Sequence, residues 1–180
     1  MTTPMASSTA SDSLKWIIAG GQTGWWLEDA VAGGVISHSH GRTIDEAEHV
    51  WLAWVTHNLS DVHGDRHLAA RGPFGGPLVL GALAAAIVIG LAEPAVPDPA
   101  LAGATITRGW RSIRLAGPLR AGDTLRAESR IDAVGPASAS GVGMVTRTVT
   151  GLDQAGRTVV EIEEVDRPVA ARMSSRQDPT

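Results

Sequence analysis

The sequence predicts an α+β fold in which an antiparallel β-sheet wraps around one buried central helix. The segment from Leu78 to Leu91 is apolar on nearly all faces of a helix, which is typical of a buried helix. Four segments with strand-like patterning follow it, separated by turns that contain Gly, Pro or Asp. One helix followed by an antiparallel run of strands is an α+β order. The four predicted strands are Thr105 to Leu115, Thr124 to Val134, Gly141 to Leu152 and Thr158 to Val165.

Composition restricts the class of protein. The chain has 180 residues, of which 43% are hydrophobic and 19% charged, as expected for one globular domain. The net charge is −4 and no basic block stands out, so we expect no nucleic-acid partner. No cysteine is present, which excludes disulfides and suits a cytoplasmic location. The longest apolar run, Pro77 to Leu91, is too short for a spanning helix, so we expect no membrane partner.

The two ends of the chain differ from its middle. Residues 1–13 are rich in Ser, Thr and Ala, residues 173–180 are polar, and we predict that both are disordered tails. Residues 14–172 then form a single domain. Near its start, Trp16 to Trp26 combines three glycines with three tryptophans and predicts a loop that covers apolar surface or a dimer seam.

The first half of the domain predicts a strand and a helix before the central one. Gly33-Gly34 indicates a turn, and a short strand follows it to His38. Thr43 is a candidate N-cap with Glu46 three residues on, as in a capping box. The predicted helix ends near His57-Asn58. Its apolar residues fall at helical spacing on one face: Ala47, Val50, Trp51, Trp54 and Val55.

The densest polar cluster runs from Thr56 to His67. It holds three His and two Asp, residue types that suit zinc or iron. The spacing matches no strong metal motif, and we therefore expect neither a metal ion nor a cofactor. A solvated loop, with a short helical stretch at Arg66 to Ala70, is the alternative to a site.

Several segments, in this order, resemble the MaoC-like, or type 2 enoyl-CoA hydratase, family. The resemblance runs from about Trp26 to Val165, and although none of these motifs is specific by itself, their order is characteristic. The segments are Trp26-Leu27-Glu28-Asp29 with Gly41-Arg42-Thr43, Thr56-His57-Asn58 through His63-Gly64-Asp65, Phe74-Gly75-Gly76 through Gly81-Ala82-Leu83, and Gly117-Pro118 through Gly122-Asp123-Thr124-Leu125.

The resemblance implies a hotdog domain that forms a homodimer and shares active sites across the seam. It implies a hydratase or dehydratase that adds or removes water at the double bond of an enoyl thioester, either an acyl-CoA or a carrier-bound acyl group. His63 is then the acid/base, because histidine is the side chain most often used to move protons near neutral pH. Backbone N–H groups around Leu80 and Gly81 would hold the thioester oxygen. Close helix–sheet packing explains Gly81 equally well.

One position departs from the family pattern. The family's catalytic Asp lies five residues before the His, and Asn58 stands there in this sequence. Asn58 can orient water but cannot accept its proton. Mesaconyl-CoA hydratases also have Asn there, so it marks either a subfamily or lost chemistry. Asp61 is a candidate for the missing carboxylate, or caps a short helix, whereas we expect Asp65 to be structural.

Other functions stay open at this stage. One is a dehydratase or cyclase that acts on a polyketide-like intermediate, and another is a non-catalytic hotdog binding subunit. A hotdog thioesterase matches the motifs less well. Arg71, Arg111 and Arg114 are candidates to bind CoA phosphates, although a solvated strand face explains them as well.

Overall fold

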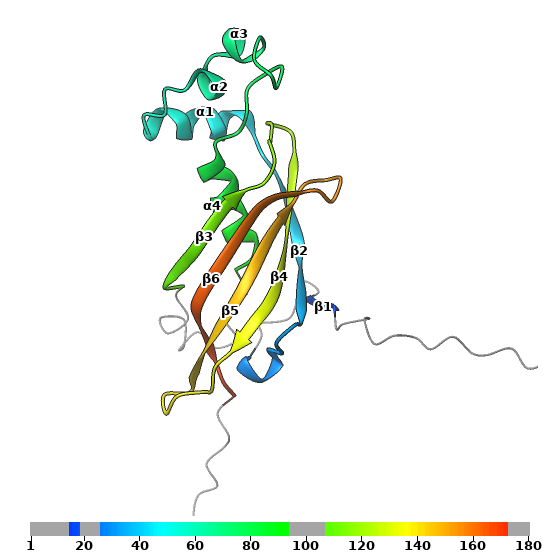
Figure 1. The fold of residues 1–180 in the computed structure, drawn as a ribbon, viewed down its shortest axis with the longest axis vertical. Coiled ribbons are helices and arrows are strands. Elements are labelled where there is room, and N and C mark those ends of the chain that lie inside the picture. Colours follow the sequence, from blue (N-terminus) through cyan, green and yellow to red (C-terminus); the bar gives the residue numbers. More distant parts are fainter. Residues whose placement is uncertain (1–14, 19–25, 94–106, 173–180) are drawn as a thin grey trace, which may run out of the picture.

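A computed structural model describes residues 15–18, 26–93 and 107–172 of the chain. One six-stranded sheet, in the order β1-β2-β4-β5-β6-β3, carries the helix α4 on one face (Figure 1). In chain order the elements are β1 (Lys15–Ile18), the 3-10 helix η1 (Leu27–Asp29), β2 (Val35–Thr43), α1 (Glu46–Val55), α2 (Asp61–Gly64), α3 (Arg66–Ala69), α4 (Gly81–Leu91), β3 (Gly109–Leu115), β4 (Thr124–Val134), β5 (Val142–Leu152) and β6 (Thr158–Ala170).

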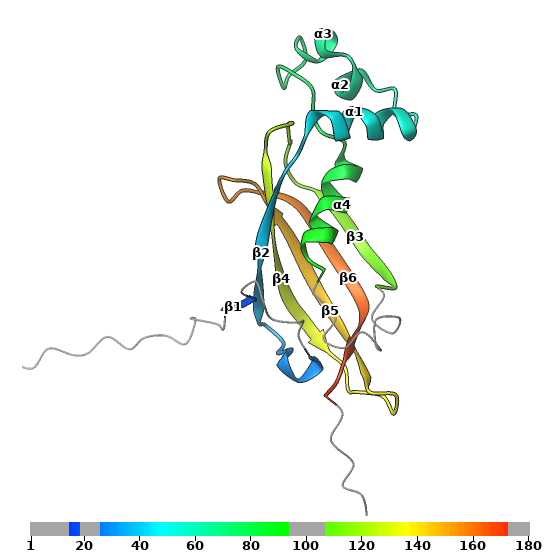
Figure 2. The same cartoon turned by 180° about the vertical axis from the view of Figure 1, so that it is seen from behind.

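The predicted α+β architecture, an antiparallel sheet around a central helix, is confirmed. Strands β2, β4, β5, β6 and β3 pair antiparallel, and only β1 joins its neighbour β2 in parallel. Ile87 and Val88 of α4 pack in one core cluster with apolar side chains of β4, β5 and β6. The other face of α4 is open to solvent among the described residues (Figure 2): Ala82, Ala86 and Gly90 are exposed.

Strand β5 shows how the sequence makes this packing possible. Every second residue is buried, as expected for a strand that covers a core on one face. Gly151 lies on the buried face, where an added Cβ would overlap the side chain of Val88. The glycine therefore lets the central helix approach the sheet closely.

The central helix begins later than predicted, at Gly81 and not at Pro77. The preceding residues are extended because their N–H groups bond to other segments. Leu78 N–H donates to the carbonyl of Val62 at 3.0 Å, and Val79 N–H donates to that of Leu119 at 2.8 Å. Those bonds compete with a first helical turn.

No helix in the described part of the chain is long and apolar enough to cross a membrane.

The first helix, α1, corrects two predictions. Asp45 caps it with Glu48 in a capping box, because Thr43 is held in β2 opposite Thr124. The helix also projects beyond the sheet together with α2 and α3 (Figure 1), so little of the sheet lies beneath it. Trp51 is therefore 63% exposed and Trp54 73% exposed. The residues that α1 buries are His49 and Ala53.

Other boundaries also differ from the predicted ones. A strand, β1, occupies residues 15–18, where we expected a loop; it forms because it pairs with β2. Strand β2 continues past His38 to Thr43, and β6 continues past Val165 to Ala170. The two predicted tails, residues 1–13 and 173–180, lie outside the described residues. The short helix α2 replaces part of the expected loop before α3.

Candidate active site

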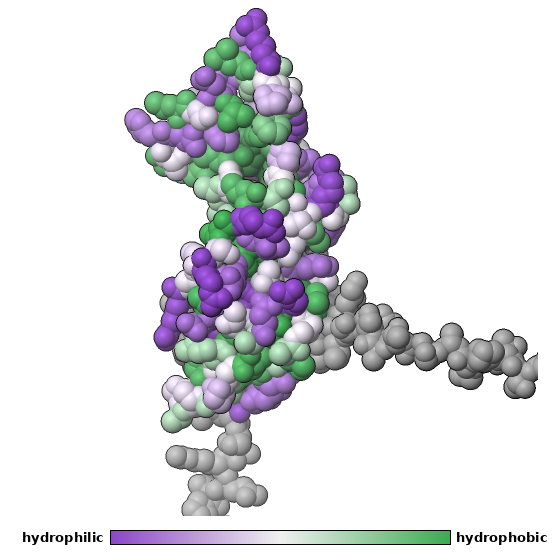
Figure 3. All heavy atoms as spheres, viewed as in Figure 1, coloured by the Kyte–Doolittle hydropathy of each residue, from purple (hydrophilic) through white to green (hydrophobic). Residues whose placement is uncertain are grey.

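A cavity of about 290 Å³ lies at the N-terminal end of α4, beside the edge strand β3. In the space-filling view, the molecule narrows between the α1–α3 end and the sheet (Figure 3). The cavity lining is mostly apolar, with one ionisable side chain, His63, and the helix residue Gly81. The other lining residues are Phe74, Leu78, Val79, Ala84, Leu115, Gly117, Pro118, Leu119 and Val159.

The short helix α2 holds His63 in this cavity. Nδ1 of the ring lies 2.8 Å from the carbonyl oxygen of Leu78. A carbonyl oxygen only accepts hydrogen bonds, so Nδ1 must carry the proton in this contact. In the neutral ring, Nε2 then keeps its lone pair. The geometry therefore leaves His63 able to act as a base through Nε2.

The start of α4 supplies a backbone donor. The first N–H groups of a helix have no partner within the helix, and they lie at its partially positive end. The Leu80 N–H points to Nδ1 of His49 at 3.3 Å, and Leu80 does not line the cavity. Leu80 and Gly81 are the two candidates to hold the thioester oxygen, and the backbone N–H of Gly81 therefore fits that role better than the N–H of Leu80. An added Cβ at Gly81 would overlap the end of the Leu115 side chain of β3, so this glycine also lets helix and strand pack closely.

The remaining candidates lie outside the cavity. Asn58 is half-buried, and its side-chain oxygen accepts the N–H of Ser60 at 3.2 Å. Asp61 is exposed in the first turn of α2 and lines a second hollow of similar volume, on which Phe74 also borders. Asp65 caps α3 by accepting the N–H of Leu68 at 2.9 Å, which agrees with a structural role. The structure thus brings together His63 and Gly81, but neither Asn58 nor Asp61 with them.

Comparison with known proteins identifies the family. Residues 29–151 match the model of the MaoC like domain. The chain belongs to the MaoC-like family. A comparison with curated protein sequences gives no match.

Several solved structures share the fold. The MaoC-like dehydratase from Rhodospirillum rubrum is 27% identical, with a TM-score of 0.68 over 84% of this chain and 100% of that one. The (R)-hydratase from A. caviae involved in PHA biosynthesis is 23% identical, with a TM-score of 0.59 over 77% of this chain and 96% of that one. A conserved hypothetical protein from Mycobacterium tuberculosis with a double hotdog fold is 19% identical, with a TM-score of 0.64 over 88% of this chain and 47% of that one. The predicted hotdog fold is therefore confirmed.

The two other histidines of the predicted polar cluster in this MaoC-like domain, His57 and His67, lie away from the cavity. His57 is exposed and has a positive φ of 53° at the end of α1, and His67 is exposed on α3. Neither lines the cavity. Within the described ranges, no three side chains of His, Asp or Glu are grouped so that they could hold a metal ion.

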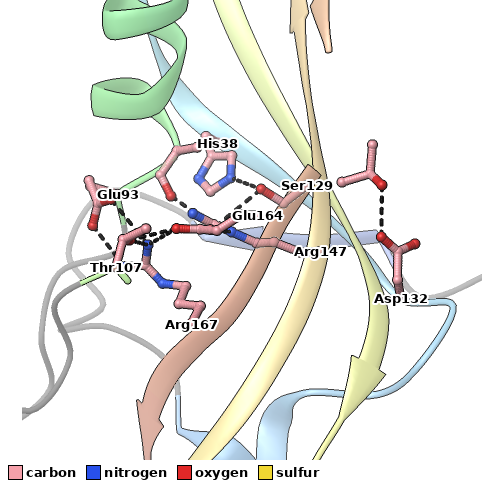
Figure 4. A network of polar contacts seen from close by, with 10 residues as sticks. His38, Glu93, Thr107, Ser129, Asp132, Arg147, Glu164 and Arg167 are labelled. Carbon is pink, nitrogen blue, oxygen red and sulfur yellow. Dashed lines mark hydrogen bonds and ion pairs between the residues drawn. The ribbon is translucent and has the colours of Figure 1, made fainter. Parts of the chain in front are cut away.

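A buried polar network, missed from the sequence, occupies the other end of α4 (Figure 4). Arg147 of β5 pairs with Glu164 of β6 and donates to the carbonyl of Ala92 at 3.0 Å. Arg167 bridges Glu164 at 3.0 Å and Glu93 at 2.7 Å. The alternation of residues along the strands puts these charged side chains on the face of the sheet that covers the core. The sequence pattern does not show that the opposite charges would meet there. Because each buried charge is paired, the network can be buried without a free ion.

His38 of β2 joins the same network through Nε2, which lies 2.8 Å from the Ser129 hydroxyl. Burial, together with the nearby positive charges of Arg147 and Arg167, lowers the pKa of His38 to about 4. His38 is therefore neutral near pH 7. For Glu164, burial alone would raise the pKa, but Arg147 and Arg167 hold it below its usual range.

Two of the three arginines considered for phosphate binding are paired on the sheet. Arg111 contacts Glu163, and Arg114 contacts Glu161 at 2.9 Å, both across the β3–β6 pair. These pairs agree with the solvated strand face. Arg71 is exposed close to the turn that carries Phe74, and it stays a candidate for phosphate binding.

Proposed function

We propose that this chain is a hydratase or dehydratase that adds or removes water at the double bond of an enoyl thioester, carried on CoA or on a carrier protein. One observation carries the proposal: His63, with Nδ1 bonded to Leu78, lines the same cavity as Gly81 at the start of α4. A base and a backbone donor beside one apolar cavity are what this reaction needs. Membership of the MaoC-like family supports the same chemistry.

In the hydration direction, the water oxygen forms a bond to C3 of the enoyl group, and a water proton passes to Nε2 of His63. The electrons of the double bond move toward the thioester oxygen, whose negative charge the Gly81 N–H stabilises. A proton then returns to C2, so that one water is consumed as OH on C3 and H on C2. The roles of Asn58 in orienting the water and of Asp61 as a second proton carrier stay part of this proposal, although neither side chain lines the cavity.

The proposal includes a homodimer. Strand β3 lies at the edge of the sheet and exposes Trp110, Ile113 and Leu115 to 44–57%. An exposed apolar edge strand tends to pair with another strand. Leu115 also lines the cavity, so a second copy paired with β3 would close the site from that side. Light scattering at micromolar concentration should give the mass of a dimer, and a monomer would contradict this part of the proposal.

The test of the proposed activity is turnover with a panel of enoyl-CoA thioesters of different chain lengths. Replacing His63 with Ala should lower turnover by roughly 10²–10⁴-fold, the usual range for loss of a general acid/base, while the fold survives. His67→Ala is the matched control, because His67 is exposed outside the cavity, and it should keep turnover. Equal activity of both variants would remove His63 from the mechanism.

A second candidate is a non-catalytic binding subunit, favoured by Asn58 in place of the family's Asp. It predicts that the thioester binds, as measured by calorimetry, but is not converted by the wild-type chain. Retention of an acyl-carrier protein, with turnover only of carrier-bound substrate, would instead favour the specialised dehydratase or cyclase.

A further inference from the structure

His49, a buried side chain that does not line the cavity, joins the two parts of the proposed site. It lies on the inner side of α1 and is 3% exposed. Its Nδ1 lies 3.3 Å from the N–H of Leu80, and its Nε2 lies 3.1 Å from the carbonyl oxygen of His63. The N–H can only donate and the carbonyl can only accept. His49 is therefore neutral in this arrangement, with its proton on Nε2.

The two peptides that His49 contacts come from different segments. The carbonyl belongs to His63 in α2, and the N–H belongs to Leu80, the residue directly before Gly81 at the start of α4. Two more bonds link the same segments: Leu78 N–H to Val62 at 3.0 Å, and the His63 ring to Leu78 at 2.8 Å. The four bonds together fix α2 against the extended segment that leads into α4.

We propose that His49 is a positioning residue for the hydration that we propose above, on which this inference rests. It sets the placement of the His63 ring relative to the Gly81 N–H, the two groups that must act on one substrate. By accepting the Leu80 N–H, it also leaves Gly81 as the helix donor at the cavity. A misplacement of about 1 Å in a reacting group costs roughly 10²-fold in rate.

Three variants separate the two bonds of His49. Asn carries its amide near the place of Nδ1 and can still accept from Leu80, but it cannot reach the carbonyl of His63. Gln carries its amide near the place of Nε2 and can still donate to His63, but not accept from Leu80. Leu makes neither bond.

Positioning predicts a graded loss of kcat with KM little changed. His49→Leu should lose roughly 10²-fold in kcat, His49→Asn nearly as much, and His49→Gln clearly less, because it keeps the bond to His63. The melting temperature is measured for each variant. A merely structural role predicts instead that kcat per folded molecule is unchanged in all three, and that result would overturn the inference.

A readout that needs no activity uses the ¹⁵N chemical shifts of the histidine rings. In the wild type, His63 should be protonated at Nδ1 and His49 at Nε2. In His49→Leu, the His63 ring should populate both neutral tautomers, or its ¹⁵N chemical shifts should change. In the control His67→Leu, at an exposed position, the chemical shifts of the His63 ring should stay unchanged. Unchanged chemical shifts of the His63 ring in His49→Leu would refute the inference, whether or not an enoyl thioester is turned over. Absence of turnover by the wild type would refute only the proposed function.

Discussion

Arg147 and Glu164 form an ion pair in the interior, and both side chains are 2% exposed. Arg114 of β3 and Glu161 of β6 form a second pair 2.9 Å apart on the same sheet, but their side chains are 63% and 40% exposed. The two pairs allow a matched comparison of a buried and a surface ion pair.

Replacing Glu164 with Gln should lower the free energy of unfolding by about 3–5 kcal/mol, because it leaves two buried guanidinium groups with too little negative charge. Replacing Glu161 with Gln should cost less than about 1 kcal/mol, since water already screens that pair. Urea denaturation of both variants measures the difference. Similar losses in the two variants would show that the inner network is not buried in solution.

Stability should depend on pH through His38. Its pKa is about 4 when folded and 6.5 when unfolded, so between these values the unfolded chain binds more protons and stability falls as the pH falls. The loss should approach about 3 kcal/mol at pH 4. Denaturation curves from pH 7 to pH 4 measure it. His38→Gln should remove most of this slope, and a variant with the full slope would contradict the assignment.

Asp61 and Asp65 should respond differently to substitution. Asp65→Ala removes the cap of α3 and should cost about 1 kcal/mol of stability with turnover largely kept. Asp61→Asn keeps shape without charge and, in the proposed role, should lower turnover more than Asp65→Asn, with the melting temperature little changed. Normal turnover by Asp61→Asn would show that Asn58 and His63 suffice.

Phe74 should limit the length of the acyl chain. It lines both the His63 cavity and the neighbouring hollow, each of about 290 Å³. Phe74→Ala should join the two and raise kcat/KM for longer chains relative to short ones, by about fourfold for each methylene newly buried. Phe74→Leu, which retains a bulky wall, is the control. The same chain-length profile in all three proteins would exclude Phe74 as the boundary.

The sequence by itself determined the fold class, the family and the strands of the second half. Strand β4 begins and ends as predicted, at Thr124 and Val134, because alternation and turn residues are local signals. The sequence also predicted His63 as the acid/base, from a short segment, and the structure places its side chain in the cavity. The N-terminal boundary of α4 was missed, since Leu78 and Val79 bond to segments far away in the chain.

The tertiary structure alone decided which polar residues lie together. Arg147 comes from β5, and Glu164 and Arg167 come from β6. Only the register of β5 and β6 makes their charges compensate. His49 looked like one more helix residue until folding placed its two ring nitrogens between Leu80 and His63. Hydrogen bonds between distant segments depend on distances in space, and no local pattern in a sequence encodes those distances.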